Sequence, residues 1–123
     1  MLGSTVTLTV NGNAKVLNLV NQDNFSGEYL LKEATEEWRL KVAHQRQSAD
    51  KLTGVVYERH NATFTNTVFA VAGVSPELRR QFSTTWVMKA GDELPALYAS
   101  NAVAAWLTAS SSAKTVAILG WES

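Results

Sequence analysis

The sequence predicts an α+β fold: an N-terminal β-hairpin and an antiparallel sheet of about five strands, followed by two C-terminal helices. Three observations support this class. Polar and apolar residues alternate with a period of two over much of residues 5–89, as in half-buried strands. Turn-forming residues separate these segments, beginning with Asn11-Gly12-Asn13. The alternation stops near residue 90, and helix-forming residues dominate from there to residue 119.

The strands are expected in the first three quarters of the chain. In order, they cover residues 5–10, 14–20, 26–32, 37–47, 55–70 and 79–89. Segment 55–70 is long and rich in Val, Thr, Tyr and Phe, so we expect two strands joined by a bend near residues 65–67. Gly73 and Pro76 predict a loop at residues 71–78.

Two helices are expected after the last strand, over residues 96–109 and 113–119. Asp92 can cap the first helix, and Pro95 suits its first turn. Three consecutive serines then interrupt the helical pattern, and the last of them, Ser112, can cap the second helix. Gly120 is expected to end that second helix.

The chain has 123 residues, enough for a single domain with its own core. We divide the domain 1–123 into a hairpin (1–22), a sheet (25–90) and helices (92–119). Lys+Arg and Asp+Glu number 11 each, so any nucleic-acid role needs its positive charge gathered on one face. The sequence contains no cysteine, which excludes disulfides and thiolate metal sites. No apolar stretch nears the ~20 residues of a membrane span, so no membrane partner is expected.

The first expected helix is apolar on most sides, which predicts burial on most sides. One helix covers a width of only about 10 Å. Five strands spaced ~4.8 Å apart form a sheet about 24 Å wide, so one chain cannot cover its own sheet. A twofold partner is the simplest remedy, and we expect an obligate homodimer. Its interface should include Leu97, Val103, Trp106 and Leu107.

Alternation divides the expected sheet into an apolar and a polar face. The apolar face, under the helices, should hold Leu40, Val42, Ala62, Phe64, Phe82 and Trp86. The polar face should hold Arg39, Lys41, Gln45, Tyr57, Arg59, Asn61, Thr63, Gln81, Ser83, Thr85 and Lys89, with no Asp or Glu among them. Cationic side chains on this face can bind phosphates, and amide or hydroxyl side chains can form hydrogen bonds with bases. By itself this pattern favours an ordinary solvated sheet surface over a binding surface.

Other chemistry-bearing residues favour structural roles. His44 and His60 fall on the apolar parity together with Glu58, and two histidines without a third ligand do not predict a metal site. We expect neighbours or an interface to satisfy their ring nitrogens, with Glu58 paired to one of them. The four tryptophans suit core and dimer-interface positions. No serine–histidine–acid order, glycine-rich phosphate loop or metal-ligand spacing indicates an enzyme, a cofactor or a small-molecule substrate. A divalent cation at subunit contacts has no predictable position.

The order of elements and three local stretches resemble the coat proteins of single-stranded RNA bacteriophages (levivirus type). The resemblance runs from Thr5 to Trp121. The stretches are Trp38-Arg39-Leu40-Lys41-Val42 with Arg46-Gln47, then Tyr57-Glu58-Arg59-His60-Asn61-Ala62-Thr63-Phe64, and Gly91-Asp92-Glu93-Leu94 before the helix. None of the three is a strict signature, so length, strand order and local similarity carry the resemblance together.

The resemblance implies a structural role in a virion, for a protein made in the bacterial host cytoplasm. Two subunits should join their sheets edge to edge, with each subunit's helices over the other's sheet. The loop between the last two strands, with Val71, Gly73, Ser75 and Pro76, should make contacts between dimers in an icosahedral shell. The polar face should bind single-stranded viral RNA through Arg39, Lys41, Gln45, Tyr57, Arg59, Asn61, Thr63, Ser83, Thr85 and Lys89. It should also bind an RNA hairpin as a translational repressor.

One alternative from another functional class stays open on the sequence alone. A small dimeric RNA-binding regulator could share the sheet-and-helix plan without forming shells. Particle size separates the two functions, because a coat protein forms large RNA-filled particles and a regulator remains a dimer.

Overall fold

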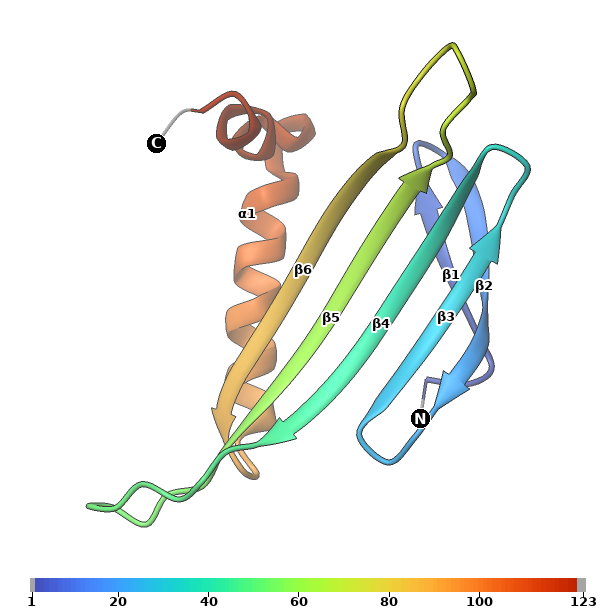
Figure 1. The fold of residues 1–123 in the computed structure, drawn as a ribbon. Coiled ribbons are helices and arrows are strands. Elements are labelled where there is room, and N and C mark those ends of the chain that lie inside the picture. Colours follow the sequence, from blue (N-terminus) through green and yellow to red (C-terminus); the bar gives the residue numbers. More distant parts are fainter. Residues whose placement is uncertain (1, 122–123) are drawn as a thin grey trace.

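The computed structural model describes residues 2–121. Six strands form one sheet in the order β1-β2-β3-β4-β5-β6, and a long helix α1 follows (Figure 1). The elements are β1 Thr5–Val10, β2 Asn13–Gln22, β3 Ser26–Lys32, β4 Glu36–Arg46, β5 Tyr57–Val68, β6 Leu78–Lys89 and α1 Glu93–Leu119. Each strand pairs antiparallel with its neighbour in sequence. The α+β class is confirmed, but the sheet has six strands rather than about five.

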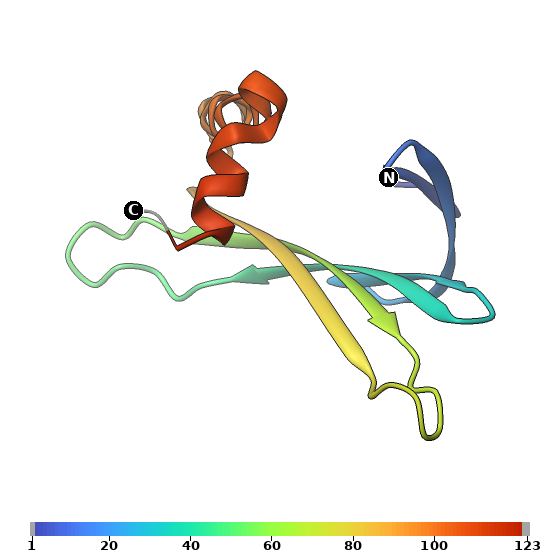
Figure 2. The same ribbon diagram turned by 90° about the horizontal axis from the view of Figure 1, so that it is seen from above.

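The N-terminal hairpin is part of this sheet, not a separate unit beside it. Strand β2 pairs with β3, and the pairing register shifts between Leu19 and Asn21. Such bulges bend a strand and increase its twist. The hairpin therefore curls up from the sheet on the side where α1 lies (Figure 2).

The hydrophobic core lies beneath this curled hairpin. Its buried members are Leu17, Tyr29 and Trp38, with partly buried side chains from β1 to β5 around them. Trp38 stacks on Phe64 with ring centroids 5.7 Å apart, and the Tyr29 hydroxyl donates to the Gly3 carbonyl at 2.8 Å. Of the expected tryptophan anchors only Trp38 is buried, so the core lies at one side of the sheet.

Strand β5 is one continuous strand, and the predicted bend near residues 65–67 is wrong. Every residue of Tyr57–Val68 pairs with β6, and most pair with β4 as well. Hydrogen bonds to β4 and β6 keep β5 extended even where its own alternation of polar and apolar residues is weak.

Helix α1 contains the expected interruption at the three serines. Ala109 leaves helical dihedral angles, and Ser110, Ser111 and Ser112 have φ of 52°, 57° and 63°. The Thr115 hydroxyl donates to the Leu107 carbonyl at 2.9 Å across this kink. The two predicted helices are thus one kinked element.

The helix also differs from the predictions at its first turn. Asp92 occupies the N-cap position, but its side chain makes no capping hydrogen bond there. By length and composition α1 could cross a membrane. The kink leaves residues 93–108 as the longer helical segment, which is shorter than the about 20 residues a span requires.

Candidate nucleic-acid interface and self-contact surfaces

The pairing register places the predicted polar residues on one face of the sheet, opposite α1. Lys41, Thr63 and Ser83 form one cross-strand row. The next rows along the strands are Ala43–Asn61–Thr85 and Gln45–Arg59–Val87, while Tyr57 pairs with Lys89. A shallow depression in this face is lined by Lys41, Ala43, His44, Gln45, Arg59, Asn61 and Thr63. Most of the residues expected to share a surface therefore do so.

Asn61 is held in place at the centre of this face. Its Nδ2 donates to the Thr85 hydroxyl at 2.7 Å, and its Oδ1 accepts from the Thr63 hydroxyl at 2.7 Å. An amide offers two donors and two acceptor positions, so one of each stays available. A side chain fixed by one partner on β6 and one on its own strand β5 can present these groups to a base without losing further rotamer freedom.

The charge on this face is less uniform than the sequence predicted. Arg39 pairs with both Glu28 and Glu37, the latter at 3.6 Å. Glu28 lies on the polar face because it pairs with Lys41 in the β3–β4 register, and Glu37 lies there because it is two residues from Arg39 in β4. Among residues 2–121, Lys41, Arg59 and Lys89 form no ion pair of 4 Å or less, so each adds unpaired positive charge to this face.

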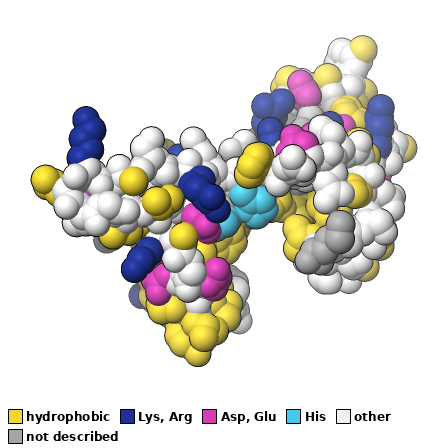
Figure 3. Space-filling view, turned by 90° about the horizontal axis from the view of Figure 1, so that it is seen from below, with side chains coloured by type: hydrophobic (Ala, Val, Ile, Leu, Met, Phe, Trp, Pro, Cys, Tyr) yellow, Lys and Arg dark blue, Asp and Glu magenta, His cyan; other side chains and the backbone are white. Residues whose placement is uncertain are grey.

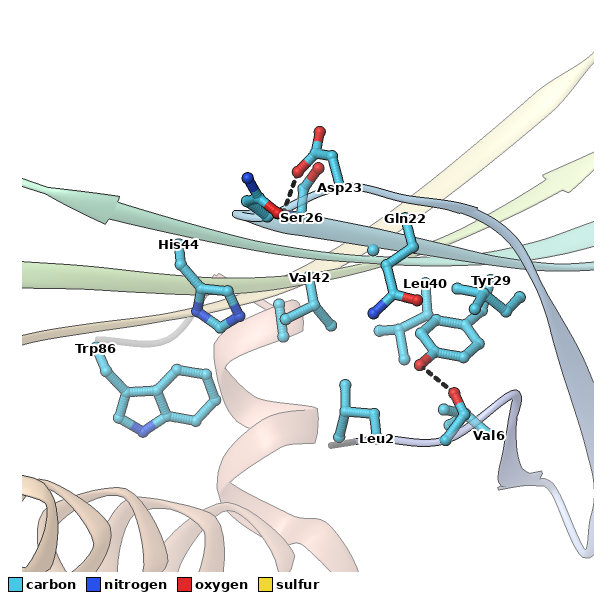
Figure 4. A pocket seen from close by; sticks show the side chains of 15 residues that line it. Leu2, Val6, Gln22, Asp23, Ser26, Tyr29, Leu40, Val42, His44 and Trp86 are labelled. Atoms are coloured by element: carbon cyan, nitrogen blue, oxygen red, sulfur yellow. Dashed lines mark hydrogen bonds between the residues drawn. The ribbon is translucent and has the colours of Figure 1, made fainter.

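The opposite face forms a trough, defined here by Val6, Leu19, Leu40, Val42, Ala62 and Trp86. It lies between the curled hairpin and α1, and Figure 3 shows it as a hollow bordered by hydrophobic side chains. In Figure 4 the side chains of Leu40 and Val42 from β4 and of Trp86 from β6 point into it. An open apolar surface of this kind marks a contact site.

Helix α1 presents a second unburied apolar surface. None of its residues is buried, and Leu97, Val103 and Trp106 are 47%, 56% and 50% exposed. A groove between α1 and β6 includes Phe82, Val103 and Leu107. The predicted interface residues thus all lie on a helix that its own chain leaves uncovered.

Comparison with known proteins identifies what these surfaces belong to. A family model described as the coat protein of phage phiCb5 matches residues 3–89. The chain belongs to this coat protein family. The resemblance to single-stranded RNA phage coat proteins is confirmed, and with it a structural, non-enzymatic role in the virion capsid. A search of curated proteins found no match.

The matched region of the coat protein covers the whole sheet and ends at Lys89, before α1. The polar face and the trough therefore lie on the part of the chain that carries the family likeness. Self-assembly follows from membership of a capsid-forming family.

The loop between β5 and β6 of the coat protein is closed on itself. Val71 and Ser75 exchange backbone hydrogen bonds of 2.9 and 3.0 Å around Gly73, which has φ of 73°. Val71 and Val74 are 51% and 80% exposed. The loop thus presents apolar side chains on a compact turn, as a contact element would.

A second loop, residues 47–56 between β4 and β5, projects from the sheet (Figure 2). The backbone N–H groups of Thr53 and Leu52 donate to the Asp50 carboxylate at 3.0 and 2.8 Å and lower the pKa of Asp50. These bonds order the tip, where Leu52 is 97% exposed. Its apolar tip was not predictable as an exposed group, because leucine usually marks burial.

The two histidines lie opposite each other at one end of the trough. His44 Nδ1 and His60 Nδ1 are 2.7 Å apart, and His60 Nε2 lies 3.2 Å from Glu58 Oε2. The expected pairing of Glu58 with one histidine is confirmed. Each imidazole has a neighbour for its ring nitrogen, as the sequence led us to expect.

Proposed function

We propose that this coat protein is an obligate homodimer, and that its dimers build an icosahedral shell around single-stranded viral RNA. One observation carries the proposal: α1 is apolar on most sides yet has no buried residue, and it stands beside an apolar trough of the same chain. Two copies related by a twofold axis would cover both surfaces at once, because each helix would lie over the other trough.

The edge of the sheet supports the same arrangement. Strand β6 is the last strand, and its Phe82 and Val87 are 61% and 57% exposed. An unpaired edge with exposed apolar residues is a template for strand addition. Pairing β6 with its twofold copy would extend the sheet across the dimer and join the two polar faces into one.

The polar face is proposed to hold RNA inside the shell and to recognise an RNA hairpin as a translational repressor. Lys41, Arg59 and Lys89 would meet phosphates, while Asn61 and Tyr57 would contact unpaired bases. In this proposal the chain 1–123 is one domain, because the helix of each subunit packs on the sheet of its partner and neither part is complete alone. Zero net charge does not oppose RNA binding, because the unpaired cations gather on this face.

RNA binding should weaken when the unpaired cations are removed. Arg59→Ala and Lys41→Ala should lower affinity for genomic and random RNA alike, and each should reduce the slope of log affinity against log salt by roughly one. Asn61→Ala or Tyr57→Ala should instead reduce discrimination for one hairpin, by about 1–3 kcal/mol. Filter binding at two salt concentrations measures both effects.

Lys114→Ala, which removes a cation from α1, is the matched control and should bind RNA as the parent does. Thermal melts should show unchanged dimers for the four polar-face variants, because their side chains point away from the trough. If Lys41→Ala and Arg59→Ala bind normally while Leu40→Ala does not, the assignment of the two faces is inverted.

The loop between β5 and β6 should act between dimers. Deleting residues 72–75 removes the turn closed by the Val71–Ser75 bonds and most of its apolar surface. We expect dimers with parental thermal stability that form altered shells or none, as seen by electron microscopy and light scattering. Unfolding of the dimer by this deletion would show that the loop belongs to the subunit fold.

Electron microscopy of the expressed protein tests the proposal as a whole. A coat protein should yield uniform, RNA-filled spherical particles. Dimers that bind RNA but never form particles, over a range of protein and salt concentrations, would favour the small RNA-binding regulator instead.

A further inference from the structure

We propose that His44 and His60 form a binding site for a borderline divalent transition-metal ion, of which Zn²⁺ is the representative. The site lies on the trough side of the sheet, at the junction of β4 and β5, apart from the polar face proposed for RNA. It does not depend on the proposed dimer or shell, because both ligands belong to one chain.

Strand pairing brings the two imidazoles together. His44 and His60 are directly opposite each other in the β4–β5 ladder. The backbone N–H of His44 donates to the Phe25 carbonyl on the other side, at 2.7 Å, so the two histidines form a non-hydrogen-bonded pair. In such pairs the side chains approach most closely. The two rings meet edge to face, with centroids 5.0 Å apart.

Glu58 determines which nitrogen of His60 is free to bind a metal ion. His60 Nε2–H donates to the Glu58 carboxylate at 3.2 Å, so a neutral His60 carries no proton on Nδ1. This Nδ1 lone pair points at His44 Nδ1, 2.7 Å away. A carboxylate behind a histidine is the usual support of a zinc ligand, because it orients the ring and raises its basicity.

The geometry needs only a small adjustment to accept the ion. Two imidazole nitrogens bound to tetrahedral zinc at about 2.05 Å are roughly 3.3 Å apart. The observed 2.7 Å separation would therefore widen by rotation of the exposed His44 ring. The proton on His44 Nδ1 would move to Nε2 through solvent, leaving two lone pairs directed at the metal.

The surroundings select the class of ion. No cluster of three or more His, Cys, Asp or Glu that could hold a metal occurs within residues 2–121, so water would complete the coordination. Two imidazole nitrogens suit Zn²⁺, Ni²⁺ or Cu²⁺ and not the oxygen-seeking Ca²⁺ or Mg²⁺. Arg46 lies 3.7 Å from Glu58 and keeps this carboxylate behind His60, not on the metal. The structure thus places a cation site where the sequence could not.

Isothermal titration calorimetry of Zn²⁺ into untagged, chelator-treated protein tests the site. We expect one saturable site per chain and no comparable binding of Ca²⁺. His44→Gln and His60→Gln should each abolish the saturable binding. Glu58→Gln should weaken it by about 10–100-fold, as loss of a carboxylate behind a ligand does. Glu77→Gln, which removes the same charge from an exposed loop position, is the matched control and should leave the affinity unchanged.

Two results would overturn the site. The first is the absence of stoichiometric Zn²⁺ binding by the unaltered protein, and the second is equal binding by both histidine variants. Should a variant misfold in circular dichroism, zinc-edge X-ray absorption of the loaded parent protein decides instead. It should show imidazole nitrogens at about 2.0 Å, and a shell of oxygen ligands alone would contradict the proposal.

Discussion

Replacing Trp106 by aspartate should abolish soluble dimers and particles together. Trp106 is half exposed in the single chain, on a helix with no buried residue. In the proposed dimer the indole is buried against the partner, and a carboxylate there would be desolvated without a counter-charge. In the proposed obligate dimer the folded subunit and the dimer are one state, so the protein should lose its thermal transition rather than become a stable monomer.

Asn101→Asp provides the matched control, because it adds the same charge to α1 at a position that is already polar and exposed. It should form dimers and particles as the parent does. Light scattering and circular dichroism over a range of concentrations distinguish the outcomes. A folded Trp106→Asp monomer, or dimers unaffected by the substitution, would remove the basis of the interlocked arrangement.

Trp38→Ala should be the most destabilising substitution within the subunit. Trp38 is one of three buried hydrophobic residues in the described chain, and its ring stacks on Phe64. Its Nε1–H donates to Glu33 at 3.0 Å, and Lys15 Nζ lies 5.4 Å from the ring centroid. Removing a core tryptophan costs about 3–5 kcal/mol, a large part of the 5–15 kcal/mol that typically stabilises a folded protein. Urea denaturation at fixed chain concentration measures the loss.

Trp38→Phe separates the packing of the ring from its hydrogen bond. Phenylalanine keeps an aromatic ring against Phe64 but lacks the N–H group that reaches Glu33, so the loss should be clearly smaller than for alanine. Glu33 should remain ionised in this variant, since the side-chain hydrogen bond from Lys15 is the main cause of its lowered pKa. If alanine and phenylalanine cost the same, the core does not depend on the stacked ring.

Much of the candidate site follows from the sequence because a strand alternates strictly between two faces. That rule placed Lys41, Arg59 and Asn61 together without any knowledge of the register. It also put His44 and His60 on the trough side. The all-round apolar composition of residues 94–107 predicts burial on most sides by a second copy, and within its own chain the helix has no buried residue.

What the sequence could not provide depends on contacts between strands. Arg39 contacts Glu28 only because of the register between β3 and β4, so the face was predicted to be more basic than it is. Glu37, two residues from Arg39 in the same strand, was a signal that alternation already offered. Strand β5 is continuous because β4 and β6 pair with it on both sides. The strand propensity of its own residues contains no information about these pairings. The distance between the two histidine nitrogens likewise depends on side-chain positions that the sequence does not give. Alternation predicts only the face of the sheet on which each histidine lies.

The order of strands has a consequence for how quickly finished subunits accumulate. Because every strand pairs with its neighbour along the chain, the sheet can form from local hairpins at a rate independent of protein concentration. Helix α1 finds no burial in its own chain, so in the proposed dimer its final packing requires an encounter between two chains. That last step is second order in chain concentration. At low chain concentration, newly made chains would therefore persist as incomplete subunits, and the rate of dimer formation would rise with the square of their concentration.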